Sequence, residues 1–142
     1  MAIKKRGSAH WEGTLKEGTG TVSTGSGAIQ SNPYGFNTRF EDKPGTNPEE
    51  LVAAAHASCF SMAFSMVLGQ SDMTATSIET TATVTLEEKD GGYAVTKSHL
   101  DVTVSVPGAD EAKVRDAAEG AKANCPISKL LTAEVTMDLT VG

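Results

Sequence analysis

The fold is decided by residues 46–71, TNPEELVAAAHASCFSMAFSMVLGQS. This stretch opens with a helix start, because Asn47 can cap free backbone amides and Pro48 suits the first helical position. The two glutamates that follow face the positive end of the helix dipole. Beyond them the stretch has no charged residue, and its apolar residues surround the helix axis instead of forming a stripe. Helices of that kind are buried on every side, so a long buried helix ending near Gly69 is predicted.

A helix buried on every side needs more cover than this short chain supplies. The sheet of a small domain can pack against only one side, and the simplest partner for the other side is a second copy of the chain. A membrane span is the rival interpretation. His56, several serines and the lack of a basic flank or a second span argue against it. We therefore expect a homodimer and no membrane insertion.

The segments around this helix carry strand and turn signals. Short β-type runs before it, separated by turn residues, predict a small antiparallel meander. Two alternating runs around Asp90-Gly91-Gly92 predict a hairpin, with a register change near Lys97–His99. The expected strands are Ala9–Leu15, Thr19–Thr24, Phe36–Glu41, Ser77–Glu88, Tyr93–Val106 and Thr132–Val141.

Two helical segments are expected between the hairpin and the last strand. Asp110–Ala123 has helix-forming composition behind an aspartate cap, and Cys125-Pro126 restarts a short helical turn through Leu131. Because strands and helices do not alternate as βαβ units, the predicted fold class is α+β. An antiparallel meander and a hairpin pack on the long central helix plus a second helix. The length of 142 residues predicts one domain, 1–142.

Charge and cysteine content narrow the class of protein. Twelve basic against eighteen acidic residues give a net charge of −6 without a basic patch, which argues against nucleic-acid binding. The basic residues 4–6 precede no apolar segment of an export signal, so a cytoplasmic location is expected. In a reducing compartment, two cysteines are more typical of a catalytic or sensing pair than of a permanent disulfide. Two inert buried thiols are the alternative.

Cys59 lies in the middle of the apolar helix, where burial raises a thiol pKa and disfavours the thiolate. A reactive Cys59 therefore needs a cation nearby. Arg39, on the expected strand, is favoured because its charge is permanent and its fork can hold both a thiolate and a peroxide oxygen. His56, one turn earlier, is the second candidate. The alternatives are an outward-facing arginine and a hydrogen-bonded core histidine.

Cys125 precedes Pro126 at the start of a helical turn. Backbone amides and a positive dipole end are expected to point at its sulfur and lower its pKa. The two cysteines are too far apart for a Cys-x-x-Cys motif or a zinc knuckle, and the three histidines show no ligand spacing. No glycine-rich phosphate loop and no Gly-x-Ser-x-Gly elbow occur. We therefore expect no metal and no bound cofactor.

Several motifs together carry a family resemblance that covers nearly the whole chain. An asparagine–proline–glutamate helix start, a cysteine further along that helix and a distant Cys-Pro form a highly specific combination. The motifs are His10-Trp11-Glu12-Gly13, Gly20–Thr24, Tyr34–Glu41, Gly45–Leu51, Ala55–Met62 and Ala123–Lys129. The chain closely resembles the OsmC branch of the OsmC/Ohr family of bacterial organic-hydroperoxide reductases.

The resemblance implies a role for four residues. Cys59 would attack the peroxide, Cys125 would resolve the oxidised sulfur as a disulfide, Arg39 would be the activating cation, and Glu49 would hold the arginine. It also implies an intertwined homodimer with the long helices central. The reductant would be a small external dithiol, protein-bound dihydrolipoamide, with no metal, haem or flavin.

Two further expectations concern the substrate and the sharing of the site. Apolar residues are expected to line an entrance for bulky organic peroxides, in preference to hydrogen peroxide: Phe36, Phe60, Met62 and Met66. Glu49 and Cys59 are ten residues apart on one helix, about 15 Å along its axis, so Arg39 and Glu49 are expected to serve the cysteine of the other subunit.

Two functions from other classes compete with a peroxidase. One is a non-catalytic stress protein or carrier of small hydrophobic molecules, in which Cys59 is dispensable. The other is a disulfide sensor or exchange protein, whose thiols oxidise without turnover of peroxide.

Overall fold

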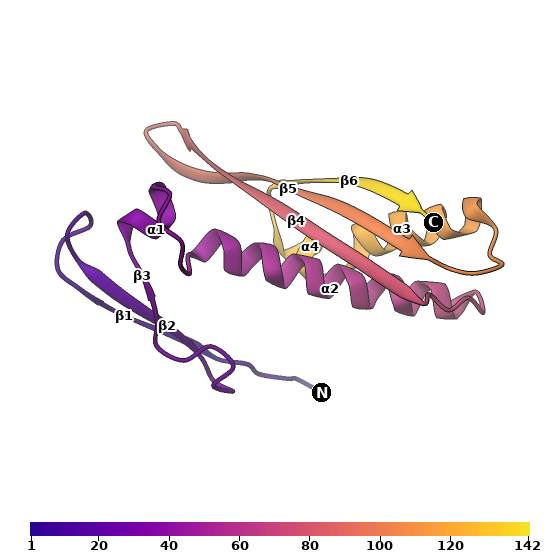
Figure 1. The fold of residues 1–142 in the computed structure, drawn as a ribbon, viewed down its shortest axis with the longest axis horizontal. Coiled ribbons are helices and arrows are strands. Elements are labelled where there is room, and N and C mark those ends of the chain that lie inside the picture. Colours follow the sequence, from indigo (N-terminus) through magenta and orange to yellow (C-terminus); the bar gives the residue numbers. More distant parts are fainter. The chain divides into compact units, whose positions relative to one another are not determined.

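The computed structural model describes residues 1–142, which divide into two compact units, Met1–Leu51 and Val52–Gly142. Figure 1 shows both, coloured along the chain. Each unit is described by itself below. Together they contain strands and helices in the order β1-β2-β3-α1-α2-β4-β5-α3-α4-β6, which confirms the α+β class. The single domain and the homodimer stay predictions.

The first unit is built on a three-stranded antiparallel sheet in the order β1-β2-β3. Its strands are β1 (Gly7–Glu12), β2 (Thr19–Thr24) and β3 (Asn32–Tyr34). Trp11 and Tyr34 flank Gly20 in the register of these strands. A Cβ at Gly20 would lie 2.5 Å from the Trp11 ring and 2.7 Å from the Tyr34 ring. Glycine is therefore required for the two aromatic rings to close over β2.

The predicted strand Phe36–Glu41 is wrong, because these residues form a short helix, α1 (Phe36–Phe40). The Gly35 amide donates a 2.9 Å hydrogen bond to the Thr38 hydroxyl, which closes the first turn. Phe36 and Phe40 then contact each other one turn apart, with ring centroids 4.9 Å from each other and ring planes tilted by 44°. Local capping and an i, i+4 aromatic pair outweigh the strand preference of the phenylalanines.

Helix α2 (Pro48–Gln70) starts and ends as predicted. The side-chain oxygen of Asn47 accepts a 2.8 Å hydrogen bond from the Glu50 amide, which is the expected cap. The Asn47 side-chain amide donates to the Thr38 carbonyl at 3.1 Å and so ties the start of α2 to α1. This double contact sets where the residues of the first turn of α2 lie relative to α1.

The second unit contains a sheet in the order β4-β5-β6. Its strands are β4 (Ser77–Lys89), β5 (Gly92–Ser105) and β6 (Glu134–Val141), with β4 antiparallel and β6 parallel to β5. Asp90 and Gly91, both with positive φ, form the predicted hairpin turn. Thr85 pairs with Lys97 and Leu86 with Val95, which leaves one extra residue on β5. The predicted register change is therefore present, one residue before the expected interval.

Two helices complete the second unit, α3 (Glu111–Asn124), capped by the side chain of Asp110, and α4 (Pro126–Leu130), which begins directly after Cys125. The core lies between one face of the sheet and helices α2 and α3 (Figure 1). Phe60, Phe64 and Leu68 of α2 are fully buried in it. The opposite face of the sheet carries polar side chains.

Burial of α2 on every side does not occur within one chain. Its fully buried residues form a single stripe at i, i+4 spacing, from His56 to Leu68, whereas Met62 and Met66 are 77% and 60% exposed. By length and composition alone α2 also meets the criterion for a membrane-spanning helix, with a mean hydropathy of 1.7. Core helices of soluble proteins meet the same criterion, and three residues of α2 are buried in this core.

Candidate active site

Arg39 and Glu49 form a two-pronged ion pair in the first unit. Arg39 Nε lies 2.9 Å from Glu49 Oε1, and Nη2 lies 3.0 Å from Oε2. Arg39 comes from α1 and Glu49 from the first turn of α2, which the Asn47 contact holds together. Arg39 Nη1 has no hydrogen-bond acceptor within the chain. The carboxylate therefore orients the guanidinium and leaves donors for a further anionic or polar group.

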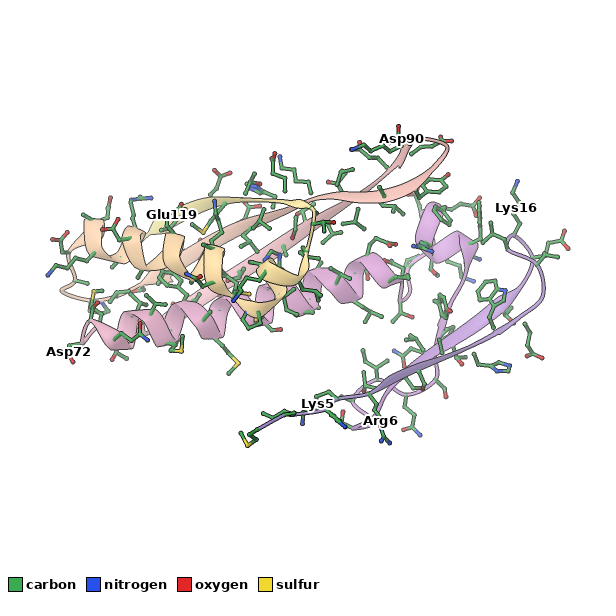
Figure 2. All side chains as sticks on the ribbon, turned by 180° about the vertical axis from the view of Figure 1, so that it is seen from behind. Lys5, Arg6, Lys16, Asp72, Asp90 and Glu119 are labelled. Carbon is green, nitrogen blue, oxygen red and sulfur yellow. The ribbon has the colours of Figure 1, made fainter.

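An aromatic pocket adjoins this ion pair. Its volume is about 190 Å³, and its lining comes from β1, β3, α1 and the loop after β1: Trp11, Leu15, Tyr34, Gly35, Phe36, Arg39 and Phe40. The Arg39 guanidinium lies 5.2 Å from the centroid of the Phe40 ring, within cation–π range. The Lys16 ammonium, labelled in Figure 2, lies 5.9 Å from the centroid of the Phe36 ring. The pocket thus combines apolar walls with positive charge.

Cys59 and Cys125 meet in the second unit. Both are free thiols, Cys125 is fully buried and Cys59 is partly buried. Burial raises the pKa of Cys59, and its hydrogen bond with the Cys125 side chain raises it further. The expectation that Cys59 needs a cation for thiolate formation therefore has a physical basis in this structure.

A backbone amide near the start of α4 contacts Cys59 and not Cys125. The Cys125 side chain makes no capping hydrogen bond, so the expectation that these amides point at its sulfur is wrong. Instead the Ile127 backbone hydrogen-bonds to Cys59 and acts to lower the pKa of that thiol, against the larger effect of burial. Cys125 is the N-cap residue and its sulfur contacts Cys59, while the amide of Ile127, the second residue of α4, reaches the Cys59 sulfur.

His56 lies one turn before Cys59 and is fully buried. Its Nδ1 is 2.7 Å from the Ser98 hydroxyl on β5, and its Nε2 is 2.7 Å from the Ser128 hydroxyl on α4. Burial lowers the pKa of His56, so the imidazole is neutral near pH 7. A neutral ring does not supply the cation that Cys59 needs. Of the two interpretations of His56 from the sequence, a cation beside Cys59 or a hydrogen-bonded core histidine, the second is therefore correct.

The state of His56 leads to a prediction about stability and pH. Because the unfolded histidine binds a proton near pH 6.5 and the buried one stays neutral to lower pH, the unfolded state binds more protons below that value. Stability is then complete above about pH 6.5 and falls on acidification, by at most about 1.4 kcal/mol per pH unit from this residue. Urea unfolding of wild type and His56→Gln between about pH 7.5 and about pH 5.5 measures this. An equal slope in the two proteins would contradict it.

The structure thus brings the four predicted residues together as two pairs, Arg39 with Glu49 in the first unit and Cys59 with Cys125 in the second. Their chemical roles stay predictions. The sequence did not indicate Ser98, Ser128 or the Ile127 amide. Two signals were available for the serines: Ser98 is a polar residue at an inward position of β5, and Ser128 follows Cys125 by three residues. Phe60 is fully buried and lines no entrance, contrary to expectation.

Comparison with known proteins identifies the family. A family model described as OsmC-like protein matches residues 40–140. Peroxiredoxin OsmC of Escherichia coli K12 is 56% identical over 138 residues, which cover 97% of this chain and 96% of the relative. The organic hydroperoxide resistance protein OhrB of Bacillus subtilis is 29% identical over 121 residues, 84% of this chain and 87% of that protein. The chain belongs to the OsmC-like family and is a peroxiredoxin-like enzyme.

Solved structures of low sequence identity share the fold. An OsmC-like protein from Vibrio cholerae superposes with a TM-score of 0.77 at 19% identity, covering 97% of this chain and 99% of that one. The crystal structure of B. subtilis OhrB gives a TM-score of 0.68 at 22% identity, covering 96% and 98%. The α+β arrangement described above is therefore the fold of the family.

Proposed function

We propose that this enzyme reduces organic hydroperoxides, and hydrogen peroxide less well, with Cys59 as the attacking thiol and Cys125 as the resolving thiol. The observation that carries the proposal is the contact between two free thiols that are distant in the sequence. The names of the E. coli and B. subtilis relatives, a peroxiredoxin and an organic hydroperoxide resistance protein, support it.

In the first step the Cys59 thiolate attacks one peroxide oxygen. The S–O bond forms as the O–O bond breaks, and the departing alkoxide takes a proton and leaves as the alcohol, or as water from hydrogen peroxide. Cys59 is oxidised to the sulfenic acid. Arg39 stabilises the sulfur charge first and the charge on the leaving oxygen next, and Glu49 holds its guanidinium in one orientation. The unused Nη1 donors of Arg39 support this role.

In the second step the Cys125 thiol condenses with the sulfenic acid, which releases water and forms the Cys59–Cys125 disulfide. This disulfide protects Cys59 from further oxidation. An external dithiol then exchanges with it, becomes oxidised in turn and restores both thiols. We take dihydrolipoamide on a lipoylated protein as that dithiol and the reducing cytoplasm as the location. No metal, haem or flavin takes part.

The aromatic pocket beside Arg39 supports a preference for organic peroxides. Apolar walls favour a hydrocarbon substituent, while the adjoining guanidinium binds the polar oxygens. Of the residues that the sequence predicted to line the substrate entrance, Phe36 lines this pocket and the buried Phe60 does not. The other aromatic walls come from Trp11, Tyr34 and Phe40. Hydrogen peroxide has no group to fill such a pocket.

The exposed part of α2 supports a homodimer, because Met62 and Met66 leave apolar surface on a helix that a second copy can cover. We propose that Arg39 and Glu49 of one subunit act on Cys59 of the other. Glu49 and Cys59 are about 15 Å apart along one helix, so a preorganised ion pair is far from the cysteine of its own chain along that helix. A site shared between two subunits is therefore the better arrangement.

Mixing two inactive variants tests the shared site. After joint refolding of Cys59→Ser and Arg39→Ala, about half of the dimers are mixed and each has one intact site, so about a quarter of wild-type activity is expected. Native mass spectrometry confirms that heterodimers are present. Activity at the level of the separate variants, with heterodimers present, would show that each site belongs to one subunit.

Steady-state turnover tests the proposed function as a whole. Purified protein is supplied with dihydrolipoamide and with cumene hydroperoxide or hydrogen peroxide in turn. We expect catalytic consumption of both, with a higher kcat/KM for cumene hydroperoxide. Thiol oxidation without repeated turnover would favour a disulfide sensor instead.

A further inference from the structure

The proposed reaction does not use His56, although it is a fully buried titratable residue with both ring nitrogens occupied. One of its partners, Ser98, belongs to the sheet, and the other, Ser128, belongs to the short helix that begins at Cys125. The histidine itself belongs to α2, which carries Cys59. A single side chain therefore joins α2, β5 and α4.

The spacing of these residues places the histidine bridge beside the thiols. Cys59 follows His56 by three positions on α2, and Ser128 follows Cys125 by three positions across the first turn of α4. Residues three apart on a helix lie on the same face, one turn from each other. The His56–Ser128 hydrogen bond thus runs alongside the contact between Cys59 and Cys125, one helical turn away on both helices.

Helix α4 needs such a connection. It has five residues, and a helix that short is not stable by its own backbone hydrogen bonds. It begins directly after Cys125, its N-cap residue, and its second residue, Ile127, supplies the amide that contacts Cys59. Any displacement of α4 relative to α2 therefore moves the resolving sulfur and that amide together.

We propose that His56 is a positioning residue that, through Ser128, holds α4 against α2 so that Cys125 stays at bonding distance from Cys59. This inference rests on the proposed function, because positioning matters for closure of the Cys59–Cys125 disulfide. Groups held in place react as if at very high effective concentration. A well-placed Cys125 captures the sulfenic acid before a second peroxide oxidises it to the sulfinic acid.

Two serine variants test the role with a matched control. Ser128→Ala and Ser98→Ala each remove one hydroxyl that contacts the imidazole, but only Ser128 lies on the helix that follows Cys125. Each protein is equilibrated with reduced and oxidised glutathione, in which one oxidised glutathione gives one Cys59–Cys125 disulfide and two reduced glutathiones. We expect the equilibrium constant to fall at least about tenfold in Ser128→Ala, about 30 mV less negative in potential, and to change less than about twofold in Ser98→Ala.

A purely structural role for His56 predicts another result. Both variants would then lose similar unfolding stability, and neither would change the disulfide equilibrium, which would overturn the proposal. Equal shifts in the two variants would also overturn it. Ser128→Thr, which keeps the hydroxyl, is expected to restore the wild-type equilibrium constant.

Substitution of the histidine gives a second pair, which also serves if Ser128→Ala does not fold. His56→Asn places an amide near the position of Nδ1 and keeps the hydrogen bond to Ser98. His56→Gln places an amide near the position of Nε2 and keeps the hydrogen bond to Ser128. The larger loss of disulfide stability is expected in His56→Asn, and the reverse order would contradict the proposal. Since glutathione exchange involves no peroxide, a wild-type protein that fails to turn over hydroperoxides would refute the proposed function without deciding this test.

Discussion

Cys59→Ser is expected to reduce hydroperoxide turnover to the uncatalysed rate. A serine hydroxyl at this partly buried position is not ionised near neutral pH, and no other thiol takes its place, because Cys125 is fully buried. Peroxide consumption with dihydrolipoamide as reductant measures the loss. Unfolding in urea shows whether the variant keeps its fold.

Cys125→Ser is the matched control, since it removes the other thiol and leaves the attacking one. One equivalent of peroxide is expected to be consumed rapidly, after which Cys59 accumulates as sulfenic and then sulfinic acid. Mass spectrometry of the treated variants follows these species. A Cys125→Ser protein that turns over normally with the dithiol would remove the resolving role of Cys125, and a Cys59→Ser protein with wild-type turnover would remove the attacking role of Cys59.

Arg39→Lys is expected to lower kcat/KM on the order of 100-fold although the charge is kept. Arg39 contacts both oxygens of Glu49 through Nε and Nη2 and has Nη1 donors left over. An ammonium is a point charge and cannot hold a carboxylate and a second anionic group in one plane. Steady-state kinetics with cumene hydroperoxide measures the change.

Lys16 provides the control for this substitution, because its ammonium also lies beside an aromatic ring of the pocket but pairs with no carboxylate. Lys16→Ala is expected to retain most of the activity. In Arg39→Ala the pH dependence of Cys59 alkylation should move to higher pH. An unchanged profile would show that Arg39 does not stabilise the thiolate, and neutral His56 offers no replacement.

The sequence predicted correctly those segments whose ends depend on a capping residue or a turn residue. Asn47 and Pro48 fixed the start of α2, and Asp90-Gly91 fixed the hairpin turn. The sequence of α1 predicts a strand because its two phenylalanines have strand preference, although their i, i+4 spacing also fits a helix. The signal was Gly35 followed three residues later by Thr38, whose hydroxyl accepts from the Gly35 amide.

Residues whose role depends on tertiary contacts were harder to predict. The apolar residues of α2 surround its axis, so no periodicity showed that Phe60 faces the core and Met62 faces outward. The partners of His56 come from β5 and α4, and only folding places Ser98 and Ser128 at either side of the ring. The two cysteines could be paired as candidates from the sequence, but the amide that reaches Cys59 could not.

Whether Cys59 and Cys125 act together as a peroxide-reducing pair can be read from the mass of the intact wild-type protein after one equivalent of cumene hydroperoxide. We expect that each chain loses two hydrogen atoms, that peptide mapping finds a Cys59–Cys125 disulfide within the chain, and that one equivalent of the alcohol is released. An unchanged mass with the peroxide still present, or oxidation of methionines with both thiols intact, would contradict it.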